Sequence, residues 1–221
     1  MSESKISCQG WELGPDAFHL ADPSQGRSWA NYLSNGDYGL RLNQFASGYS
    51  STLQEPRMLV THHGWNQETK GRYVYLTEKD DPDAALWNPG FLPCRTPVEG
   101  YQATHGLGWS QFEARRRNLG CESLHFLPRA GAFEIWRIRV VNRGSHPVRA
   151  TVVAQAEFLL QASAAIDVPY YSWYQDVGPL ADRTGVVVPS ATPGSPRSVG
   201  FFRSLVRPSG FEGNLRSFHG T

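Results

Sequence analysis

The sequence predicts an all-β protein in which antiparallel strands pack as a sandwich. Helical periodicity is scarce along the 221 residues, and the middle of the chain consists of short segments in which apolar and polar residues alternate. Glycine, proline, asparagine and aspartate separate these segments, as is typical of strands joined by tight turns. Three such turn signals, at residues 118–120, 129–131 and 142–145, divide residues 109–160 into four strands and favour a meander.

The last two strands of this meander are expected to differ in how their two faces are buried. From residue 148 to 160 the even-numbered positions are all apolar and the odd-numbered ones are mostly polar, which predicts one long strand with a single buried face. In the preceding strand, Trp136, Ile138 and Val140 share one face, whereas Arg137 and Arg139 lie on the other. We therefore expect the second face of that strand to be wet or covered by charged residues.

The remaining segments fit the same fold class. Residues 29–48 predict tight hairpins, with Asn35-Gly36-Asp37 as the strongest turn signal, and residues 71–77 predict a short strand. Residues 61–70 and 78–97 predict long surface loops, and the apolar run at 186–188 predicts a strand between loops. The chain has no repeat of fixed period and no linker that divides it into two units.

Charge and composition exclude several classes of partner. The 21 lysines and arginines balance 20 aspartates and glutamates, so the net charge of +1 creates no strong field for nucleic acid or anionic lipid. No stretch approaches the apolar length of a membrane span, and the first residues lack the apolar core of a signal peptide, so we expect a cytoplasmic protein. Cys8, Cys94 and Cys121 are odd in number and widely spaced, which predicts reduced thiols.

Motifs of catalysis and of metal binding are absent from the sequence. It contains no GxSxG, HExxH, P-loop or GxGxxG pattern in a suitable context. His62 and His63 are adjacent, so on an extended chain they point to opposite faces and suit a loop better than a shared metal. The carboxylates Asp80, Asp81, Asp83, Glu134 and Glu157 are interpreted as turn or ion-pair residues, and the run Arg115–Arg117 as a solvated strand end. We therefore assign no catalytic and no metal-binding residue.

Aromatic residues are the richest resource for binding a ligand. Seven tryptophans, nine tyrosines and eleven phenylalanines are present, and a sugar can stack its C–H face on such rings. One cluster combines Trp65 with Trp87 and Phe91. The sharper candidate follows Pro169 and consists of Tyr170, Tyr171, Trp173, Tyr174 and Gln175. These side chains predict either a sugar-binding loop or rings that cap the end of the sandwich, and the sequence leaves both interpretations open.

Several blocks of the sequence, taken in order, resemble the N-terminal domain of glycoside hydrolase family 94, which contains inverting phosphorylases of cellobiose, cellodextrins, laminaribiose and chitobiose. The blocks are WANYLSNGDYGLRLNQFASGYS (29–50), EPR (55–57), GRYVYL (71–76), LWNPGFLP (86–93), YQATHGLGWSQF (101–112), EIWRIRVVN (134–142) and AEFLL (156–160). The resemblance implies an antiparallel β-super-sandwich of the galactose-mutarotase type. It divides the chain into a lead-in at 1–28 and a sandwich domain at 29–221 that is expected to be incomplete at its C-terminal end.

The resemblance also carries expectations about function. In the family, an (α/α)6 barrel supplies the general acid and the phosphate-binding residues, and nothing in this sequence resembles that barrel. The expected role of this chain is therefore non-catalytic: it serves dimerisation and covers the sugar site of a phosphorylase that uses inorganic phosphate as co-substrate, without a cofactor, and acts on β-linked oligosaccharides. Two alternatives remain open at this point, namely a domain of a cyclic β-glucan synthase or transglycosylase, and a stand-alone carbohydrate-binding module.

Overall fold

The computed structural model describes most of the chain. The described residues are 6–8, 11–13, 16–24, 29–55, 57–62, 71–79, 81–83, 85–161, 177–189, 198–214 and 217–218. Seventeen β-strands can be delineated in these ranges, and every strand pairing is antiparallel. The all-β fold class predicted from the sequence is confirmed.

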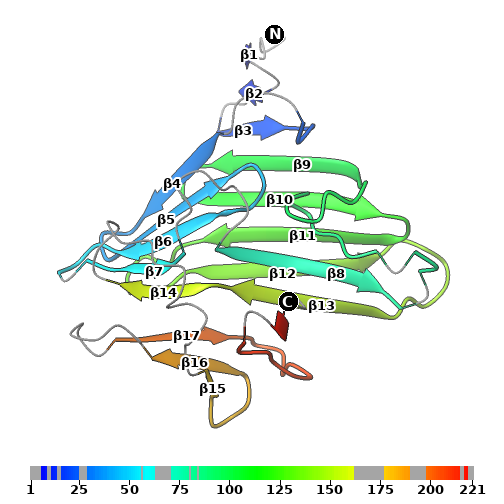
Figure 1. Cartoon of the computed structure of the whole chain (residues 1–221). Helices are drawn as coiled ribbons and strands as arrows, with labels where there is room; N and C mark the ends of the chain where they lie inside the picture. Colours follow the sequence, from blue (N-terminus) through cyan, green and yellow to red (C-terminus); the bar gives the residue numbers. More distant parts are fainter. Residues whose placement is uncertain are drawn as a thin grey trace.

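One of the two layers is a single seven-stranded sheet. Its strand order is β1 (Ile6–Cys8), β2 (Trp11–Leu13), β3 (Ala17–Leu20), β9 (Glu99–Gly106), β10 (Trp109–Arg116), β11 (Leu119–Phe126) and β12 (Ile135–Asn142). Strands β9 to β12 form a continuous meander, because short turns join each strand to the next (Figure 1). Strands β1 to β3, within the segment 1–28 that the sequence assigns to a lead-in, extend this sheet at one edge.

The second layer contains two smaller sheets. The five-stranded sheet has the order β14 (Phe158–Gln161), β7 (Leu59–Thr61), β6 (Gly48–Thr52), β5 (Tyr38–Asn43) and β4 (Ala30–Ser34). The two-stranded sheet pairs β13 (Ala150–Ala156) with β8 (Arg72–Glu78). A fourth sheet, of β15 (Gly178–Pro179), β16 (Gly185–Pro189) and β17 (Val199–Arg203), lies at the lower end of the molecule in Figure 1.

Two apolar clusters join the layers into a sandwich. The first combines side chains of β4 and β5 with side chains of β3, β9 and β10, namely Leu33, Leu40, Leu42, Ala46, Leu20, Tyr101, Ala103 and Phe112. The second combines β8 and the following loop with β10 and β11, through Val74, Leu76, Trp87, Ala114, Leu119 and Cys121. Because strands from both layers contribute to each cluster, burying these apolar side chains holds the two layers face to face.

The fourth predicted strand departs from the expected meander. The segment 148–160 divides at Glu157 into β13, which pairs with β8, and β14, which pairs with β7, so neither continues the sheet of β9 to β12. The predicted buried face is also wrong. Val152 is 45% exposed, whereas Gln155 of the opposite face is only 8% exposed. The hydroxyl of Tyr75 donates a 2.9 Å hydrogen bond to the Oε1 atom of Gln155, so this amide oxygen keeps a partner in its buried position.

Other local predictions are confirmed. Asn35-Gly36-Asp37 forms the turn between β4 and β5, where Gly36 adopts a φ of +91° that favours glycine. Arg137 and Arg139 are exposed on the outer face of β12, as expected for a charged layer, and each lies near Glu122 of β11. Cys94 and Cys121 are unpaired thiols. Burial raises the pKa of Cys94 to about 11 and that of Cys121 to about 12, where the Glu122 carboxylate adds to the effect of burial.

Asparagine side chains in the segment 29–50 tie the two layers together. Asn31 on β4 donates from its amide to three acceptors around the turn between β9 and β10, namely the carbonyl oxygens of Gly106 (2.9 Å) and Trp109 (3.1 Å) and the hydroxyl of Ser110 (3.2 Å). Asn35 donates to the carbonyls of Pro128 and Gly131 in the connection between β11 and β12. A side chain of one layer thus satisfies backbone groups of the other layer.

We predict that Asn31→Ala lowers the free energy of unfolding by about 1–3 kcal/mol, because part-buried carbonyls lose their donor. Urea denaturation followed by circular dichroism measures this change. The matched control is Tyr32→Phe, since Tyr32 is the next residue of β4 and is 70% exposed, and it should change stability little. Equal effects of the two substitutions would contradict the role of Asn31.

Candidate functional site

Charged and polar residues gather at one place between the layers. Arg72 is the first residue of β8, and its side chain is fully buried. One terminal nitrogen of Arg72 donates to Glu134 Oε2 at 2.5 Å, and the other donates to Ser50 Oγ on β6 at 2.5 Å. The hydroxyl of Ser50 in turn donates to Glu134 Oε2 at 3.3 Å. A closed triangle of hydrogen bonds therefore surrounds the buried guanidinium.

An aromatic ring completes the surroundings of this cation. The guanidinium carbon of Arg72 lies 5.6 Å from the centroid of the Trp136 ring on β12, within the range of a cation–π contact. Burying an unpaired charge is very costly, so the carboxylate, the hydroxyl and the ring together make the burial of Arg72 tolerable. Ser50 comes from one layer of the sandwich, whereas Glu134 and Trp136 come from the other.

The start of β8 is fixed by a close backbone approach. Gly71 has a φ of +106°, and a Cβ atom at this position would lie 2.3 Å from the carbonyl oxygen of Gly48 at the start of β6. Only glycine combines this backbone conformation with this contact. Because Arg72 follows directly, the approach of Gly71 to Gly48 positions the guanidinium beside Ser50.

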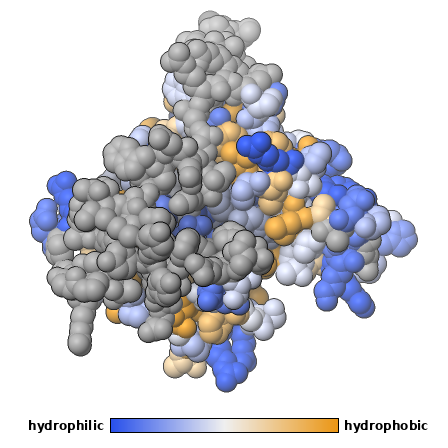
Figure 2. All heavy atoms as spheres, viewed as in Figure 1, coloured by the Kyte–Doolittle hydropathy of each residue, from blue (hydrophilic) through white to orange (hydrophobic). Residues whose placement is uncertain are grey.

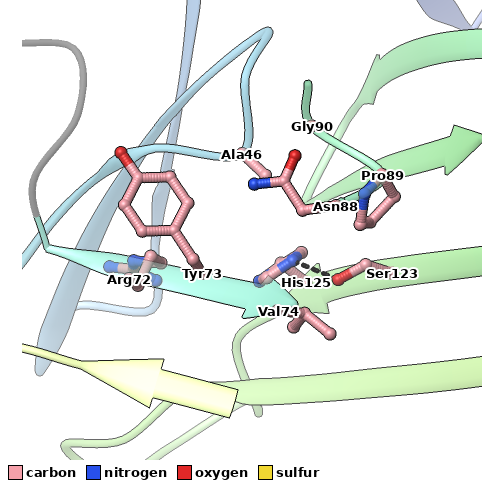
Figure 3. A pocket seen from close by; sticks show the side chains of 9 residues that line it. All are labelled: Ala46, Arg72, Tyr73, Val74, Asn88, Pro89, Gly90, Ser123 and His125. Atoms are coloured by element: carbon pink, nitrogen blue, oxygen red, sulfur yellow. Dashed lines mark hydrogen bonds between the residues drawn. The ribbon is translucent and has the colours of Figure 1, made fainter. Parts of the chain in front are cut away.

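A small hollow opens next to this cluster. Its cavity volume is about 10 Å³, which is roughly the space that one buried water molecule needs. Figure 3 shows His125 near its middle, with β8 on one side and the segment 88–90 on the other. The lining residues are Ala46, Arg72, Tyr73, Val74, Asn88, Pro89, Gly90, Ser123 and His125.

Three buried polar atoms of the lining residues have no hydrogen-bond partner within the described part of the chain. They are Arg72 Nε, Asn88 Oδ1 and His125 Nδ1. Polar groups at such depth are normally satisfied by protein or by buried water. The hollow therefore suits a molecule of the size of water and is too small for a sugar ring.

A row of rings continues from this hollow across the larger sheet. His105, Phe112, His125 and Trp136 lie on β9, β10, β11 and β12, and their successive ring centroids are 5.8, 5.7 and 5.4 Å apart. Phe202 of β17 follows Trp136 at 5.2 Å. Serine hydroxyls interleave with the histidines, since Ser110 hydrogen-bonds to His105 (2.8 Å) and Ser123 to His125 (2.7 Å).

Titratable groups of the cluster are not tuned for acid–base chemistry near neutral pH. Burial lowers the pKa of His105 to about 4, and burial together with the Arg72 charge lowers the pKa of His125 to about 3. Burial, reinforced by the Glu134 carboxylate, raises the pKa of Tyr38 well above its usual value. At neutral pH both imidazoles and this phenol are therefore neutral, and a general acid or base would need a pKa closer to the working pH. The cluster is suited to joining the layers.

A second group of charges fixes the loop that follows β8. The Asp81 side chain is 1% exposed, and it lies 2.5 Å from Arg116 and 3.1 Å from Arg117. Burial opposes ionisation of Asp81, but the backbone N–H of Asp83 and the two guanidinium groups outweigh it, so the pKa of Asp81 is lowered. The sequence pattern places these acidic and basic residues in separate surface features. Their pairing is not visible in local patterns, because 35 residues separate Asp81 from Arg116.

The sequence-predicted binding residues are distributed as follows. Tyr170, Tyr171, Trp173, Tyr174 and Gln175 lie outside the described residues, as do Trp65 and His63. Trp87 is only 1% exposed, and its backbone forms a two-hydrogen-bond bridge with Leu76, so its interpretation as a sugar-stacking surface residue is wrong.

His62 is buried, and its backbone N–H donates to the Glu157 carbonyl at 2.9 Å. Glu134 pairs with Arg72 of β8 instead of an arginine of the meander.

The described ranges bring together no set of three His, Cys, Asp or Glu side chains that could share a metal ion. The same ranges contain no helix with the length and apolarity needed to traverse a bilayer.

The two antiparallel layers of the described part, joined by two apolar clusters and a buried ion pair, define a β-sandwich domain. The family model described as "Glycosyl hydrolase 94, supersandwich domain" matches residues 17–221. The chain belongs to this family.

Curated relatives include phosphorylases. Solabiose phosphorylase of Paenibacillus borealis is 24% identical over 200 residues, which are 88% of this chain and 26% of the relative. A 3-O-beta-D-glucopyranosyl-beta-D-glucuronide phosphorylase of the same species is 30% identical over 128 residues, 58% of this chain and 16% of the relative. N,N'-diacetylchitobiose phosphorylase of Vibrio proteolyticus is 27% identical over 127 residues, 56% of this chain and 16% of the relative. The chain thus spans about a quarter or less of these relatives.

We predict that the buried histidines make the protein less stable in mild acid. An unfolded histidine has a pKa near 6.5, whereas the folded values are about 4 for His105 and about 3 for His125. The unfolded state therefore binds more protons below pH 6.5, so the contribution of these residues is fully present above that pH and declines as the pH falls toward 4. Urea denaturation between pH 7 and pH 4 measures the decline.

The slope of stability against pH in this range should be smaller for His125→Gln than for the unchanged protein, whatever the substitution does to stability at pH 7. The control is His146→Gln, because His146 is exposed in the connection between β12 and β13. An unchanged slope for His125→Gln would show that His125 does not titrate differently in the two states.

We predict that Glu134→Leu and Arg72→Met each lower the free energy of unfolding by about 3–5 kcal/mol, because each leaves a buried partner without its counterpart. The double variant Arg72→Met/Glu134→Leu should lose less than the sum of the single effects. Arg203 and Asp182, an exposed pair at 2.9 Å, provide the control, since Asp182→Asn should change the free energy of unfolding far less than either substitution at the buried pair. Additive effects at the Arg72 pair would contradict its coupling.

Proposed function

We propose that this chain is the non-catalytic sandwich domain of an inverting phosphorylase that cleaves β-linked disaccharides or oligosaccharides with inorganic phosphate. In that reaction, phosphate attacks the anomeric carbon with inversion while an acid protonates the departing sugar oxygen, which yields a sugar 1-phosphate. The observation that carries the proposal is the family match over residues 17–221, joined by three relatives that are phosphorylases.

The site geometry supports a non-catalytic role. The buried carboxylates Glu134 and Asp81 are engaged by Arg72 and by Arg116 with Arg117, and the imidazoles of His105 and His125 are neutral at physiological pH. Glycoside chemistry instead requires a proton donor with a raised pKa beside the scissile bond. The catalytic acid and the phosphate-binding groups would therefore come from another part of the enzyme.

The finer roles expected from the family resemblance belong to the same proposal. These roles are dimerisation and coverage of the sugar site by the segment that contains Tyr170, Tyr171, Trp173, Tyr174 and Gln175. Inorganic phosphate would be the co-substrate, and no other cofactor is expected. A cytoplasmic location stays a prediction from the sequence.

We predict that the 221-residue chain alone releases no phosphate from α-glucose 1-phosphate with glucose, N-acetylglucosamine or cellobiose as acceptor. The protein encoded by the longest open reading frame that contains this sequence should release phosphate from α-glucose 1-phosphate with one of these or a related acceptor. A colorimetric phosphate assay measures both. Phosphate release by the 221-residue chain alone would contradict a non-catalytic role. A folded longer protein that is inactive with every acceptor would instead favour the synthase or transglycosylase alternative.

The stand-alone binding module makes a different prediction. If the chain is such a module, the isolated protein should bind cellobiose or a longer β-glucan in isothermal titration calorimetry, and Tyr171→Ala or Trp173→Ala should abolish the binding. If the chain is a phosphorylase domain, the isolated protein should bind these sugars weakly or not at all. Tyr32→Ala, which removes an exposed aromatic side chain from β4, is the control for Tyr171→Ala and Trp173→Ala and should leave sugar binding unchanged.

A further inference from the structure

Each layer of the sandwich contains an edge strand, paired on one side alone among the described residues, at the same end of the molecule. β12 is the last strand of the seven-stranded sheet and pairs only with β11, and β13 pairs only with β8. Figure 1 shows β12 and β13 near the lower edge of the two layers. Within the described ranges, no strand pairs with the second edge of either. An edge strand presents backbone N–H and C=O groups that can pair with an additional strand.

Apolar side chains are exposed along these two strands and below them. Val140 of β12 is 36% exposed and Val152 of β13 is 45% exposed. Ala150 and Ala154 of β13 are exposed as well. The neighbouring strand β17 exposes Val199 (62%) and Phe201 (53%). Figure 2 shows orange side chains among blue ones at this lower end. A gathering of exposed apolar residues at one end of a protein marks an interaction surface more often than scattered single residues do.

The charge of the same edge is one-sided. Residues 135–156 contain four arginines and neither aspartate nor glutamate. Arg137 and Arg139 share one carboxylate, that of Glu122, at 2.9 and 3.9 Å. Arg143 and Arg149, which flank the connection between β12 and β13, have no ion-pair partner among the described residues. The edge therefore carries uncompensated positive charge beside its exposed backbone and apolar groups.

We propose that the free edge of β13 is a docking surface for an extended, acidic segment of another polypeptide, which adds to the two-stranded sheet as a third strand. Backbone hydrogen bonds to β13 provide the affinity, apolar side chains of the segment cover Val152, and its carboxylates pair with Arg143 and Arg149. The uncompensated charge of Arg143 and Arg149 favours an acidic occupant. A second copy of the chain is the competing occupant, because a symmetric pairing of two β13 edges is antiparallel and keeps the arginines of the two copies at opposite ends of the joined strands.

The probe for this proposal is a short fluorescein-labelled peptide of alternating valine and glutamate. Fluorescence anisotropy with the 221-residue protein should show binding that weakens as salt is added, because the contact is partly ionic. The same peptide with lysine in place of glutamate should bind about tenfold more weakly or not at all. A version with N-methylated backbone should also lose affinity, because it cannot form the strand hydrogen bonds. Hydrogen exchange should slow in β13 when the acidic peptide is bound.

Charge reversal tests the surface from the protein side. Arg143→Glu/Arg149→Glu should weaken binding of the acidic peptide about tenfold or more, whereas Arg57→Glu, at an exposed arginine between β6 and β7, should leave it unchanged. Circular dichroism checks that both variants fold. Equal binding of the glutamate and lysine peptides, or bound peptide without protection of β13, overturns the proposal.

The alternative occupant is separable by sedimentation. A dimer of the unchanged protein that Val152→Asp converts to a monomer would assign the edge to a second copy and overturn the proposal. Charge reversal that makes the protein self-associate, with peptide affinity unaltered, would show that the arginines only guard the edge against aggregation, and this also overturns it.

Discussion

The buried guanidinium of Arg72 is the constraint around which the two layers are arranged. It lies at the start of β8, and its hydrogen bonds reach Ser50 of β6 in the same layer and Glu134, which precedes β12 in the other. A buried cation tolerates little displacement of its partners, because each lost contact leaves charge in a medium that solvates it poorly. The relative position of the layers is therefore determined by this ionic contact as well as by the two apolar clusters. The guanidinium also acts on two neighbouring rings: it lies over the ring of Trp136, and its charge helps to lower the pKa of His125.

The segments that carry the family resemblance turn out to have structural tasks. Asn31 and Asn35 hold turns of the opposite layer, Asn43 accepts hydrogen bonds from the backbone of Phe45 and Ser47, and the hydroxyl of Tyr101 donates to the carbonyl of Gln44. Each of these side chains satisfies a backbone group that a tight turn or a layer crossing leaves without a partner. A polar motif in such a domain can therefore identify the family through its folding requirements, without contributing a reacting group.

Local patterns in the sequence were sufficient to predict the fold class, the turn at Gly36 and the wet face of β12. These patterns did not predict which strands pair with each other. Residues 148–160 alternate regularly, but the pairing of β13 with β8 and the bend at Glu157 depend on contacts with residues far away in the sequence, and these decide which face is buried. The same limit applies to the candidate site. Arg72 and Glu134, or Asp81 and Arg116, are unremarkable where they stand in the sequence and meet only through the topology of the sheets. Trp87 was misassigned because a tryptophan within a loop can be buried when the loop folds back onto a strand, as it does at Leu76.

The three-stranded sheet of β15 to β17 is attached to the sandwich by few contacts. Phe202 meets Trp136, Gly200 lies against the ring of Phe158, and the hydroxyl of Ser198 approaches the sulfur of Met58. Its other pairings are internal to the sheet. Regions with few external contacts open at lower free energy than the core to which they are attached. This sheet can therefore open as a separate unit, and a transient release of Phe202 would expose the Trp136 ring that packs on Arg72. Opening of the small sheet would then bring solvent closer to a charge that the closed sandwich keeps fully buried.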